Sequence, residues 1–346
     1  MKNTTNSRQK TEKPLHFGGA VFLFFLSIAL LLVCAILSLT FGSRQIQLPD
    51  LYQGLFGDYH QSLGATVVHT RIVRTVFSLM AGAALGISGA LMQAITRNPI
   101  ADPSVLGVNT GAALFVVVGI AYFQIHTASQ YIVLALLGSS ITAVFVYTMG
   151  SMGSGGATPI KLALAGSATS AALSSLVSAV MLPKGQVMDA FRFWQVGSVG
   201  AATWDSVAMV TPFLLVGMLI AFFCAPALNA LALGDDVATG LGVNIGLVRI
   251  LGAIAGVMLC GAVTALAGPI GFVGLMAPHL VRILLGSNQR ILIPMSAVVG
   301  ASVLTLSDVL GRLLGSPGEL EVGVVTAFVG APILIITAMR SKVRAL

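Results

Sequence analysis

Charged residues are scarce in this sequence. Only 8% of its 346 residues are Asp, Glu, Lys or Arg, whereas 56% are hydrophobic, and the mean hydropathy is +0.97. Soluble domains carry about 25% charged residues, so this chain has too little polar surface to face water on all sides. Lipid must surround most of it, and the composition predicts an all-α polytopic membrane protein.

The sequence also lacks the motifs of most catalytic and metal sites. Its three cysteines lie in apolar runs without Cys-x-x-Cys or Cys/His spacing, which disfavours a disulfide or a metal site. It has no Gly-x-Ser-x-Gly and no His-Glu-x-x-His, and "GSGGATPIK" at 153–161 fails the spacing of a phosphate-binding loop. We expect no catalytic residue, no metal and no cofactor in this chain; if ATP and Mg drive it, they act in a partner chain.

Apolar runs long enough to cross about 30 Å of hydrocarbon as helices recur along the chain. A break is expected near the eighth run, because Pro269 and Pro278, with Gly271 between them, predict a broken or re-entrant helix. The sequence therefore predicts one transmembrane domain over residues 17–340, with tails at 1–16 and 341–346. The ten runs are 17–41, 72–96, 104–123, 131–150, 162–182, 207–233, 250–267, 270–285, 291–310 and 322–339.

The distribution of basic residues predicts the orientation of these spans. With ten spans and a cytoplasmic N-terminus, twelve of the 18 Lys and Arg residues lie on the inner side, which satisfies the positive-inside rule and places both termini in the cytoplasm. The net charge of +7 then reflects topology, so nucleic acid is not an expected partner. The six outer basic residues are Arg44, Arg71, Arg74, Lys184, Arg192 and Arg312.

Glycine is abundant, at 39 residues, and much of it lies inside the spans, where small residues let helices approach closely. The pattern Gly-x-x-x-Gly occurs at 82–86 and at 252–256. These two spans begin alike, each leads to a Pro-containing break, and they are the second and seventh spans, so they run in opposite directions. They predict an inverted repeat of spans two to five on spans seven to ten, as is common in transporters.

Ionisable residues are nearly absent from the middles of the spans, which disfavours a proton-coupled carrier. His279 could be a packing residue at a helix break or a gating residue. Asp308 and Arg312 are four residues apart and can pair on one helix face. Arg71 and Arg74 could anchor a helix end by snorkelling or form a positive patch for an acidic partner.

Six stretches in order identify a family resemblance. They are "RIVRTVFSLMAGAALGISGALMQ", "RNPIADPSVLGVNTGAA", "LALGDDVATGLGVN", "GPIGFVGLMAPHLVRILLG", "LSDVLGR" and "GELEVGVVTAFVGAPILI". With them the chain closely resembles the FecCD family of membrane permeases, which belong to ABC importers for iron–siderophore complexes, haem and vitamin B12. The resemblance covers nearly the whole chain after the first span and implies ten helices per subunit in a bacterial cytoplasmic membrane.

The resemblance also implies partners. Family members pair with a second permease subunit, identical or related, and assemble with two cytoplasmic ABC ATPase subunits and an extracytoplasmic substrate-binding protein. Their translocation path is lined by the fifth, eighth and tenth helices. This arrangement would explain why the chain has no phosphate-binding loop of its own.

Residue roles follow from the same resemblance. The segment at about 229–246 would couple to the ATPase, with Asp235 and Asp236 capping a short helix and Gly240 and Gly242 as hinge or C-cap positions. The coupling residues would be Leu233, Gly234, Asp235, Asp236, Ala238, Gly240, Leu241 and Gly242, and the cytoplasmic family motif Arg97, Asn98, Pro99, Asp102 and Pro103. The binding protein would dock on Arg71, Arg74 and Arg312, and gating or path residues would be Pro269, Gly271, Pro278, His279 and Asp308.

The expected function is therefore a permease subunit of an ATP-driven importer for an iron(III)–siderophore complex. Haem or vitamin B12 is an alternative cargo. A secondary carrier driven by an ion gradient is an alternative of another class, and it would need neither ATP nor a partner ATPase. A non-transporting scaffold or sensor is the least favoured, because no additional soluble domain is evident.

Overall fold

The computed structural model describes residues 17–44, 46–60, 62–153 and 158–340, and every regular element in these ranges is a helix. The tails expected at 1–16 and 341–346 lie outside the described residues. The elements are α1 (Phe17–Thr40), α2 (Leu48–Phe56), α3 (Leu63–Thr96), η1 (Pro103–Leu106), α4 (Val108–Phe123), α5 (Ala128–Ser151), α6 (Pro159–Met181), α7 (Gly185–Gln195), α8 (Trp204–Leu231), α9 (Asp235–Gly240), α10 (Ile245–Ala267), α11 (Val273–Leu285), α12 (Gln289–Leu314) and α13 (Val322–Arg340).

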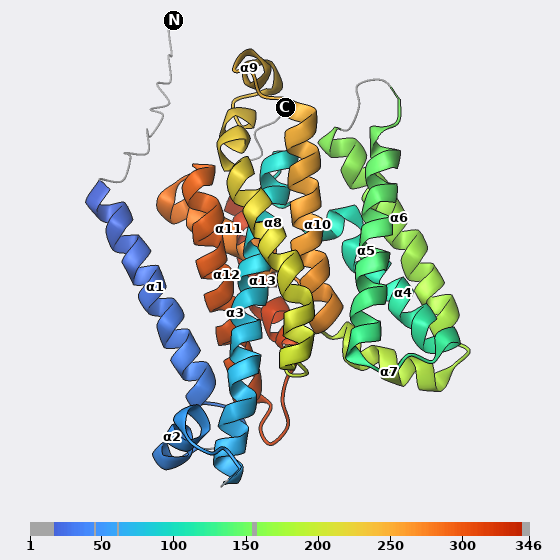
Figure 1. Cartoon of the computed structure of the whole chain (residues 1–346). Coiled ribbons are helices and arrows are strands. Elements are labelled where there is room, and N and C mark those ends of the chain that lie inside the picture. Colours follow the sequence, from blue (N-terminus) through green and yellow to red (C-terminus); the bar gives the residue numbers. More distant parts are fainter. Residues whose placement is uncertain (1–16, 45, 61, 154–157, 341–346) are drawn as a thin grey trace, which may run out of the picture.

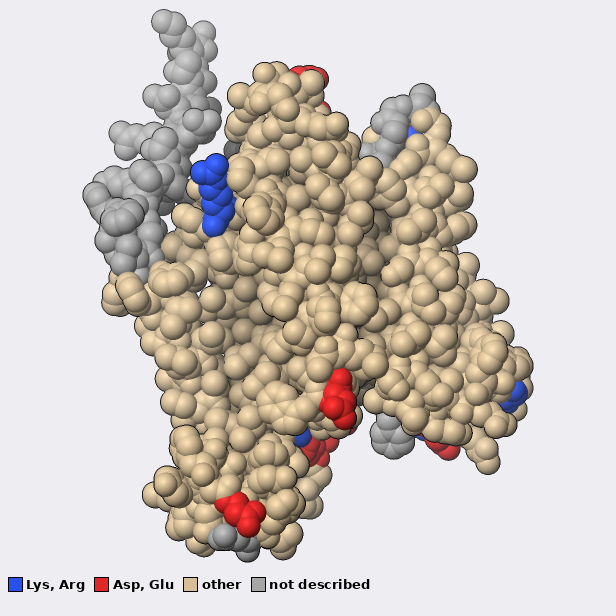
Figure 2. All heavy atoms as spheres, viewed as in Figure 1, with Lys and Arg blue, Asp and Glu red and all other residues tan. Residues whose placement is uncertain are grey.

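The all-helical prediction is confirmed, and each of the ten predicted runs overlaps a helix. Seven helices of the described chain are long and apolar enough to cross a membrane, and α4, α11 and α13 are shorter apolar helices. Charged side chains are sparse on the face seen in Figure 2, whose middle is a band without Lys, Arg, Asp or Glu. This band fits contact with hydrocarbon.

Helix ends differ most from the predicted bounds where polar residues extend an apolar run. α3 begins at Leu63, nine residues before the predicted run at 72, because Ser62 caps it by accepting a hydrogen bond from the amide of Ala65 at 3.0 Å. The short helices α2, α7 and α9 lie between spans, where hydropathy alone gives no signal.

α3 lies at the centre of the bundle, between α12, α11, α10 and α8 (Figure 1). Glycines make this position possible. Gly82 and Gly86 face the backbone of α12 at Gly300 and Ser296, and Gly89 faces Gly274 of α11, so closely that a Cβ atom on any of the three would overlap a carbonyl oxygen. The small-residue pattern of the sequence therefore marks real helix contacts.

The second glycine pattern lies in α10 and packs against α3. Gly252 of α10 faces Ile95 of α3, and Gly256 faces Met92. Each half of the chain runs through a long helix, a break, a short helix and two further helices: α3 to α6, and α10 to α13. α3 packs on α12 as α10 packs on α5, which is the exchange that an inverted repeat would give. The repeat itself stays a prediction.

The bundle has two distinct ends. α9 lies at one end, together with the described ends of α1 and α13, whereas α2, α7 and the α12–α13 connection lie at the other (Figure 1). We call them the α9 end and the α2 end.

Candidate functional site

At the α9 end, a single carboxylate holds α9 against the bundle. Asp235 accepts hydrogen bonds from Nη2 of Arg249 at 3.1 and 3.2 Å and pairs with the guanidinium of Arg97. Arg97 also donates to the carbonyl of Leu231 at 2.6 Å. These three charged residues, here named the Asp235 clamp, join the ends of α3 and α8 to α9 and α10.

The Asp235 clamp determines geometry more than stability. Its side chains are partly exposed, at 36% for Arg97, 44% for Asp235 and 17% for Arg249. Ion pairs that water reaches contribute only about 0.2–1 kcal/mol each. The clamp therefore fixes where α9 lies without dominating the folding free energy.

The prediction that Asp235 and Asp236 cap α9 is wrong in its detail. The N-cap is Gly234, with φ +119° and no side-chain cap, and both aspartates lie in the first turn, where they favour the helix dipole. Asp235 is used for the Asp235 clamp instead. The C-cap is Leu241, between the two predicted glycines: Gly240 is the last residue of α9, and Gly242 follows the cap with φ +80°. The amides of Gly242 and Val243 close the helix end on the carbonyls of Thr239 and Ala238.

α9 exposes an apolar stripe. Val237 and the C-cap residue Leu241 are four apart on one side of α9 and are 48% and 63% exposed, and Leu233, just before the helix, is 66% exposed. Ala238 is buried against the bundle. Apolar side chains that project from the charged end of a membrane protein are typical of a protein–protein contact.

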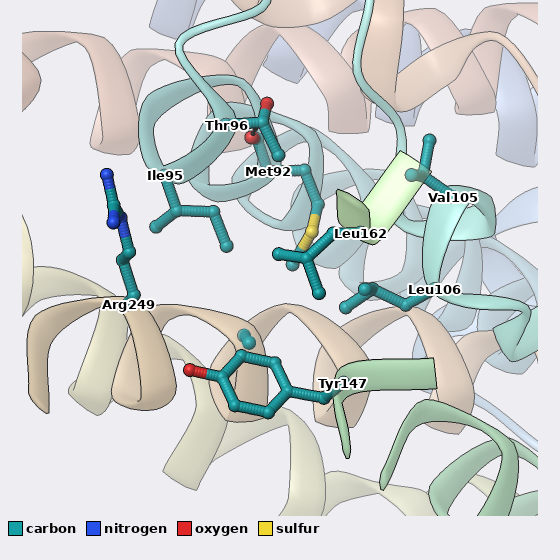
Figure 3. A pocket seen from close by; sticks show the side chains of 9 residues that line it. Met92, Ile95, Thr96, Val105, Leu106, Tyr147, Leu162 and Arg249 are labelled. Atoms are coloured by element: carbon teal, nitrogen blue, oxygen red, sulfur yellow. Dashed lines mark hydrogen bonds between the residues drawn. The ribbon is translucent and has the colours of Figure 1, made fainter. Parts of the chain in front are cut away.

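A small cavity lies next to the Asp235 clamp. It is bordered by Arg249, Tyr147 and Thr96 with apolar side chains around them, and its volume is about 10 Å³ (Figure 3). Nε of Arg249 is buried and has no hydrogen-bond partner within the described chain. A volume of about 10–15 Å³ holds one water molecule, so this cavity is far too small for a transported cargo.

The motif at 97–103 forms an ordered connection from α3 to η1. Arg97 has φ +50° and ends α3, and Asn98 accepts hydrogen bonds from the amides of Ile100 and Ala101 at 3.1 Å. Asp102 caps η1 by accepting from the amide of Ser104 at 3.0 Å, and Pro103 is the first residue of η1. The motif thus begins at the Asp235 clamp and ends inside the bundle.

The predicted gating residues do not gather at one place. Pro269 and Gly271 lie in the break between α10 and α11, where Phe272 has φ +69°, and Pro278 lies within α11. His279 borders a small hollow with Pro99, Ile100 and Phe272 on one side and α13 on the other. Asp308 lies far from this hollow, at the α2 end.

At the α2 end, the three predicted docking arginines come together around two acids. Asp308 pairs with Arg74 at 2.8 Å and with Arg312 at 3.1 Å, which confirms the expected i,i+4 pair. Arg74 also pairs with Glu319 at 2.6 Å. With Arg71 these residues form what we call the arginine cluster, whose three cations and two anions leave a net charge of +1.

Two of the three arginines are directed into the protein. Arg312 is 1% exposed and donates to the carbonyls of Ser38 and Phe41 at 3.0 and 3.1 Å. Arg71 is 5% exposed and donates to the carbonyls of Thr40 and Arg44 at 3.1 and 3.0 Å. Arg71 and Arg312 thus donate hydrogen bonds to backbone carbonyls at the end of α1 and in the connection after it. Within the arginine cluster, only the side chains of Arg74, 14% exposed, and Glu319, 39% exposed, reach the surface appreciably. Docking on these arginines stays a prediction.

Two charged residues, Glu319 and Arg249, could not be recognised as members of these sites from the sequence. Glu319 is 245 residues from its partner Arg74, and Arg249 lies near the start of an apolar run with nothing to distinguish it from a topology-setting cation. Among the described residues, no three His, Cys, Asp or Glu side chains are placed to hold a metal ion.

Comparison with known proteins gives one consistent answer. Residues 30–340 match the model of the FecCD transport family. The chain is 38% identical to the ferric enterobactin transport system permease protein FepD of Escherichia coli, covering 90% of this chain and 93% of that one. It is 37% identical to the Fe(3+)-citrate import system permease protein YfmD of Bacillus subtilis, covering 97% of both. A solved structure, described as an inward-facing conformation of a metal-chelate type ABC transporter, superposes with a TM-score of 0.81 at 27% identity over 93% of this chain and 99% of that one.

Proposed function

Because this chain belongs to the FecCD transport family, we propose that it is the permease subunit of an ATP-driven importer that moves an iron(III)–siderophore complex into the cytoplasm. The observation that carries this proposal is α9: a short helix between two long ones, fixed by the Asp235 clamp and exposing Leu233, Val237 and Leu241. A helix held in this way offers a rigid apolar stripe to the groove of a partner.

In this proposal the α9 end is cytoplasmic. The seven long apolar helices, with α4, α11 and α13, would make ten spans, and the first residues of α1 and the last residues of α13 lie at the α9 end (Figure 1). The positive-inside distribution of Lys and Arg supports this orientation. Two ABC ATPase subunits would bind at α9 of this chain and of a second permease subunit, identical or related, and would use ATP and Mg.

The path would be lined by α6, α11 and α13. Two observations support it: α6 is exposed over most of its apolar length, and the broken stretch from Gly268 to Phe272 leads into α11. Non-helical backbone at membrane depth needs protein or a water-filled cavity around it. Pro269, Gly271, Pro278 and His279 are candidate gating residues there, whereas Asp308 belongs to the arginine cluster.

The names of the relatives support a ferric chelate as the cargo. The Escherichia coli and Bacillus subtilis relatives are named for ferric enterobactin and Fe(3+)-citrate, and a further Bacillus subtilis relative is named for iron(3+)-hydroxamate, so ferric chelates are common to these names. An extracytoplasmic binding protein would deliver the chelate to the α2 end. Haem and vitamin B12 are less well supported.

Transport by the assembled complex tests this function. The permease, its partner ATPase and the binding protein loaded with radiolabelled ferric siderophore are reconstituted in proteoliposomes. Uptake is expected only with ATP and binding protein together. Uptake driven by an ion gradient without ATP would show a secondary carrier instead, and uptake of haem or cobalamin but no ferric chelate would correct the cargo.

If the binding protein docks at the arginine cluster, a change of charge there should change its association rate in a predictable direction. If acidic lobes of the binding protein approach Arg74, Glu319→Gln raises the cluster's net charge from +1 to +2 and should speed association, most at low salt. Association rates of binding protein with permease in nanodiscs, measured at two salt concentrations, check this. Asp189→Asn, at an exposed site on α7, is the charge-matched control. Slower association of Glu319→Gln alone would contradict an acidic partner at this position.

A further inference from the structure

Helix α2 carries an apolar stripe that the described part of the chain leaves exposed. Leu48, Tyr52 and Phe56 are spaced four apart on one side of α2 and are 82%, 67% and 79% exposed. The rings of Tyr52 and Phe56 lie 5.8 Å apart, between centroids. Asp50 is the only charged residue of α2, so nothing on the helix makes this stripe a charged surface.

The opposite side of α2 is attached to α3. A Cβ atom at Gly54 would lie 2.5 Å from Cβ of Val68, so the Val68 side chain of α3 packs directly on the backbone of α2 there. Ser62 donates to Oδ1 of Asp50 at 2.6 Å. These contacts fix the rotation of α2 about its axis, and the stripe is turned away from α3.

The depth of α2 follows from its neighbours. Arg71 of α3 donates to the carbonyls of Leu39 and Thr40, so Arg71 is level with the end of α1. α2 packs on α3 at Ala65 and Val68, three to six residues before Arg71, or about 5–9 Å beyond the end of α1 at 1.5 Å per residue.

That depth is the headgroup layer. The apolar stretch of α1, Phe22–Thr40, has 19 residues, or about 29 Å, and matches the hydrocarbon of about 30 Å, which therefore ends near Thr40. Headgroups extend the bilayer to about 40–45 Å, or about 5–8 Å on each side, and the contact of α2 with α3 at Val68 lies within that layer. α1 itself exposes large apolar side chains over most of its length, as a span facing lipid does. Only a short connection, 41–47, separates it from α2. Amphipathic helices with aromatic residues favour this boundary.

We propose that α2 is an interfacial helix that places Leu48, Tyr52 and Phe56 among the lipids of the outer leaflet. The occupant of this stripe is phospholipid at the boundary of headgroup and acyl chain. Because α2 packs on α3 at Val68, three residues before Arg71, the contact of α2 with lipid also sets the depth of the arginine cluster in the membrane.

Tryptophan fluorescence in vesicles tests the proposal. Tyr52→Trp and Phe56→Trp are each made with Trp194→Phe and Trp204→Phe, and the full chain is reconstituted in phosphatidylcholine brominated near the headgroup end of the acyl chains. Both variants should lose most of their fluorescence to brominated lipid and little to aqueous iodide. The control Asp58→Trp, exposed in the loop after α2, should show the reverse.

Two results would overturn the proposal. Quenching of both stripe variants by iodide and not by brominated lipid would place the stripe in water, and loss of that iodide quenching on adding binding protein would make it a protein-docking surface. Equal quenching of Asp58→Trp by brominated lipid would show that the whole α2 end lies in the membrane and that the stripe makes no special contact with lipid. If the tryptophan replacements reduce folding, Phe56→Cys and Asp58→Cys in the native-tryptophan chain provide the same comparison, because Cys34, Cys224 and Cys260 are buried. A membrane-impermeant maleimide should label Asp58→Cys quickly and Phe56→Cys slowly; equal rates contradict the proposal.

Discussion

Replacing Asp308 with alanine is expected to prevent folded permease from accumulating in the membrane. Asp308 is 1% exposed, and its carboxylate is shared by Arg74 and Arg312. Without it two largely buried guanidinium groups lose their shared counter-ion, which costs about 3–5 kcal/mol for a buried pair. Whole domains are stable by only about 5–15 kcal/mol. Folded yield and unfolding temperature in detergent, followed by size-exclusion chromatography, measure the loss.

A matched control is available at the same end of the molecule. Asp189 pairs with Arg192 at 3.7 Å, but both side chains are about 70% exposed. Asp189→Ala should therefore change stability by less than about 1 kcal/mol. Equal unfolding temperatures for Asp308→Ala and Asp189→Ala would show that the arginine cluster does not brace the bundle.

Because Arg71 and Arg312 are also buried, replacing them is a poor test of binding-protein docking. Arg71→Glu with Arg312→Glu would place two new carboxylates among backbone carbonyls and beside Asp308. Misfolding would then explain a loss of uptake as well as lost docking would. Glu319→Gln avoids this ambiguity, because it changes a charge at the surface and leaves the Asp308 pairs in place.

Most of the fold could be predicted because it depends on local patterns. Long apolar runs gave the spans, Gly82 and Gly86 marked the contact of α3 with α12, and the spacing of Asp308 and Arg312 gave their pair. Each of these signals lies within a few residues of sequence. The short helices α2 and α7 were missed because an amphipathic helix of nine to eleven residues is not apolar enough to stand out.

The sites were less predictable because they join distant parts of the chain. Arg97 and Asp235 are 138 residues apart, and Arg74 and Glu319 are 245 apart, so neither spacing nor periodicity relates them. The span count placed Arg71, Arg74 and Arg312 on the outer side, but nothing in the sequence indicated that backbone carbonyls of the protein would accept hydrogen bonds from Arg71 and Arg312. Which groups satisfy a buried cation is decided by packing.

Replacing Asp235–Gly240 with a Gly/Ser segment of equal length should abolish coupled transport. Such a segment is a flexible coil, so it removes Val237 from the apolar stripe and Asp235 from the clamp. A displacement of the ATPase would then no longer move α3, which ends at Arg97, or α10, which carries Arg249 near its start. Transport per ATP hydrolysed in proteoliposomes should fall to background, either because the ATPase dissociates or because it hydrolyses ATP without transport.

Single substitutions separate the clamp from the stripe. Asp235→Asn and Asp236→Asn each remove one negative charge from the first turn of α9, but only Asp235 has ion-pair partners within the described chain. If the clamp carries motion, Asp235→Asn lowers transport per ATP more than Asp236→Asn. Adding Arg249→Gln to Asp235→Asn should cost little more, since the hydrogen bonds of Arg249 in the described chain go to Asp235. Retained assembly and coupling in the Gly/Ser variant would refute the role of α9. Equal losses of transport per ATP from Asp235→Asn and Asp236→Asn would show that the Asp235 clamp does not contribute, because only Asp235 belongs to it. The apolar side chains would then account for the contact with the ATPase.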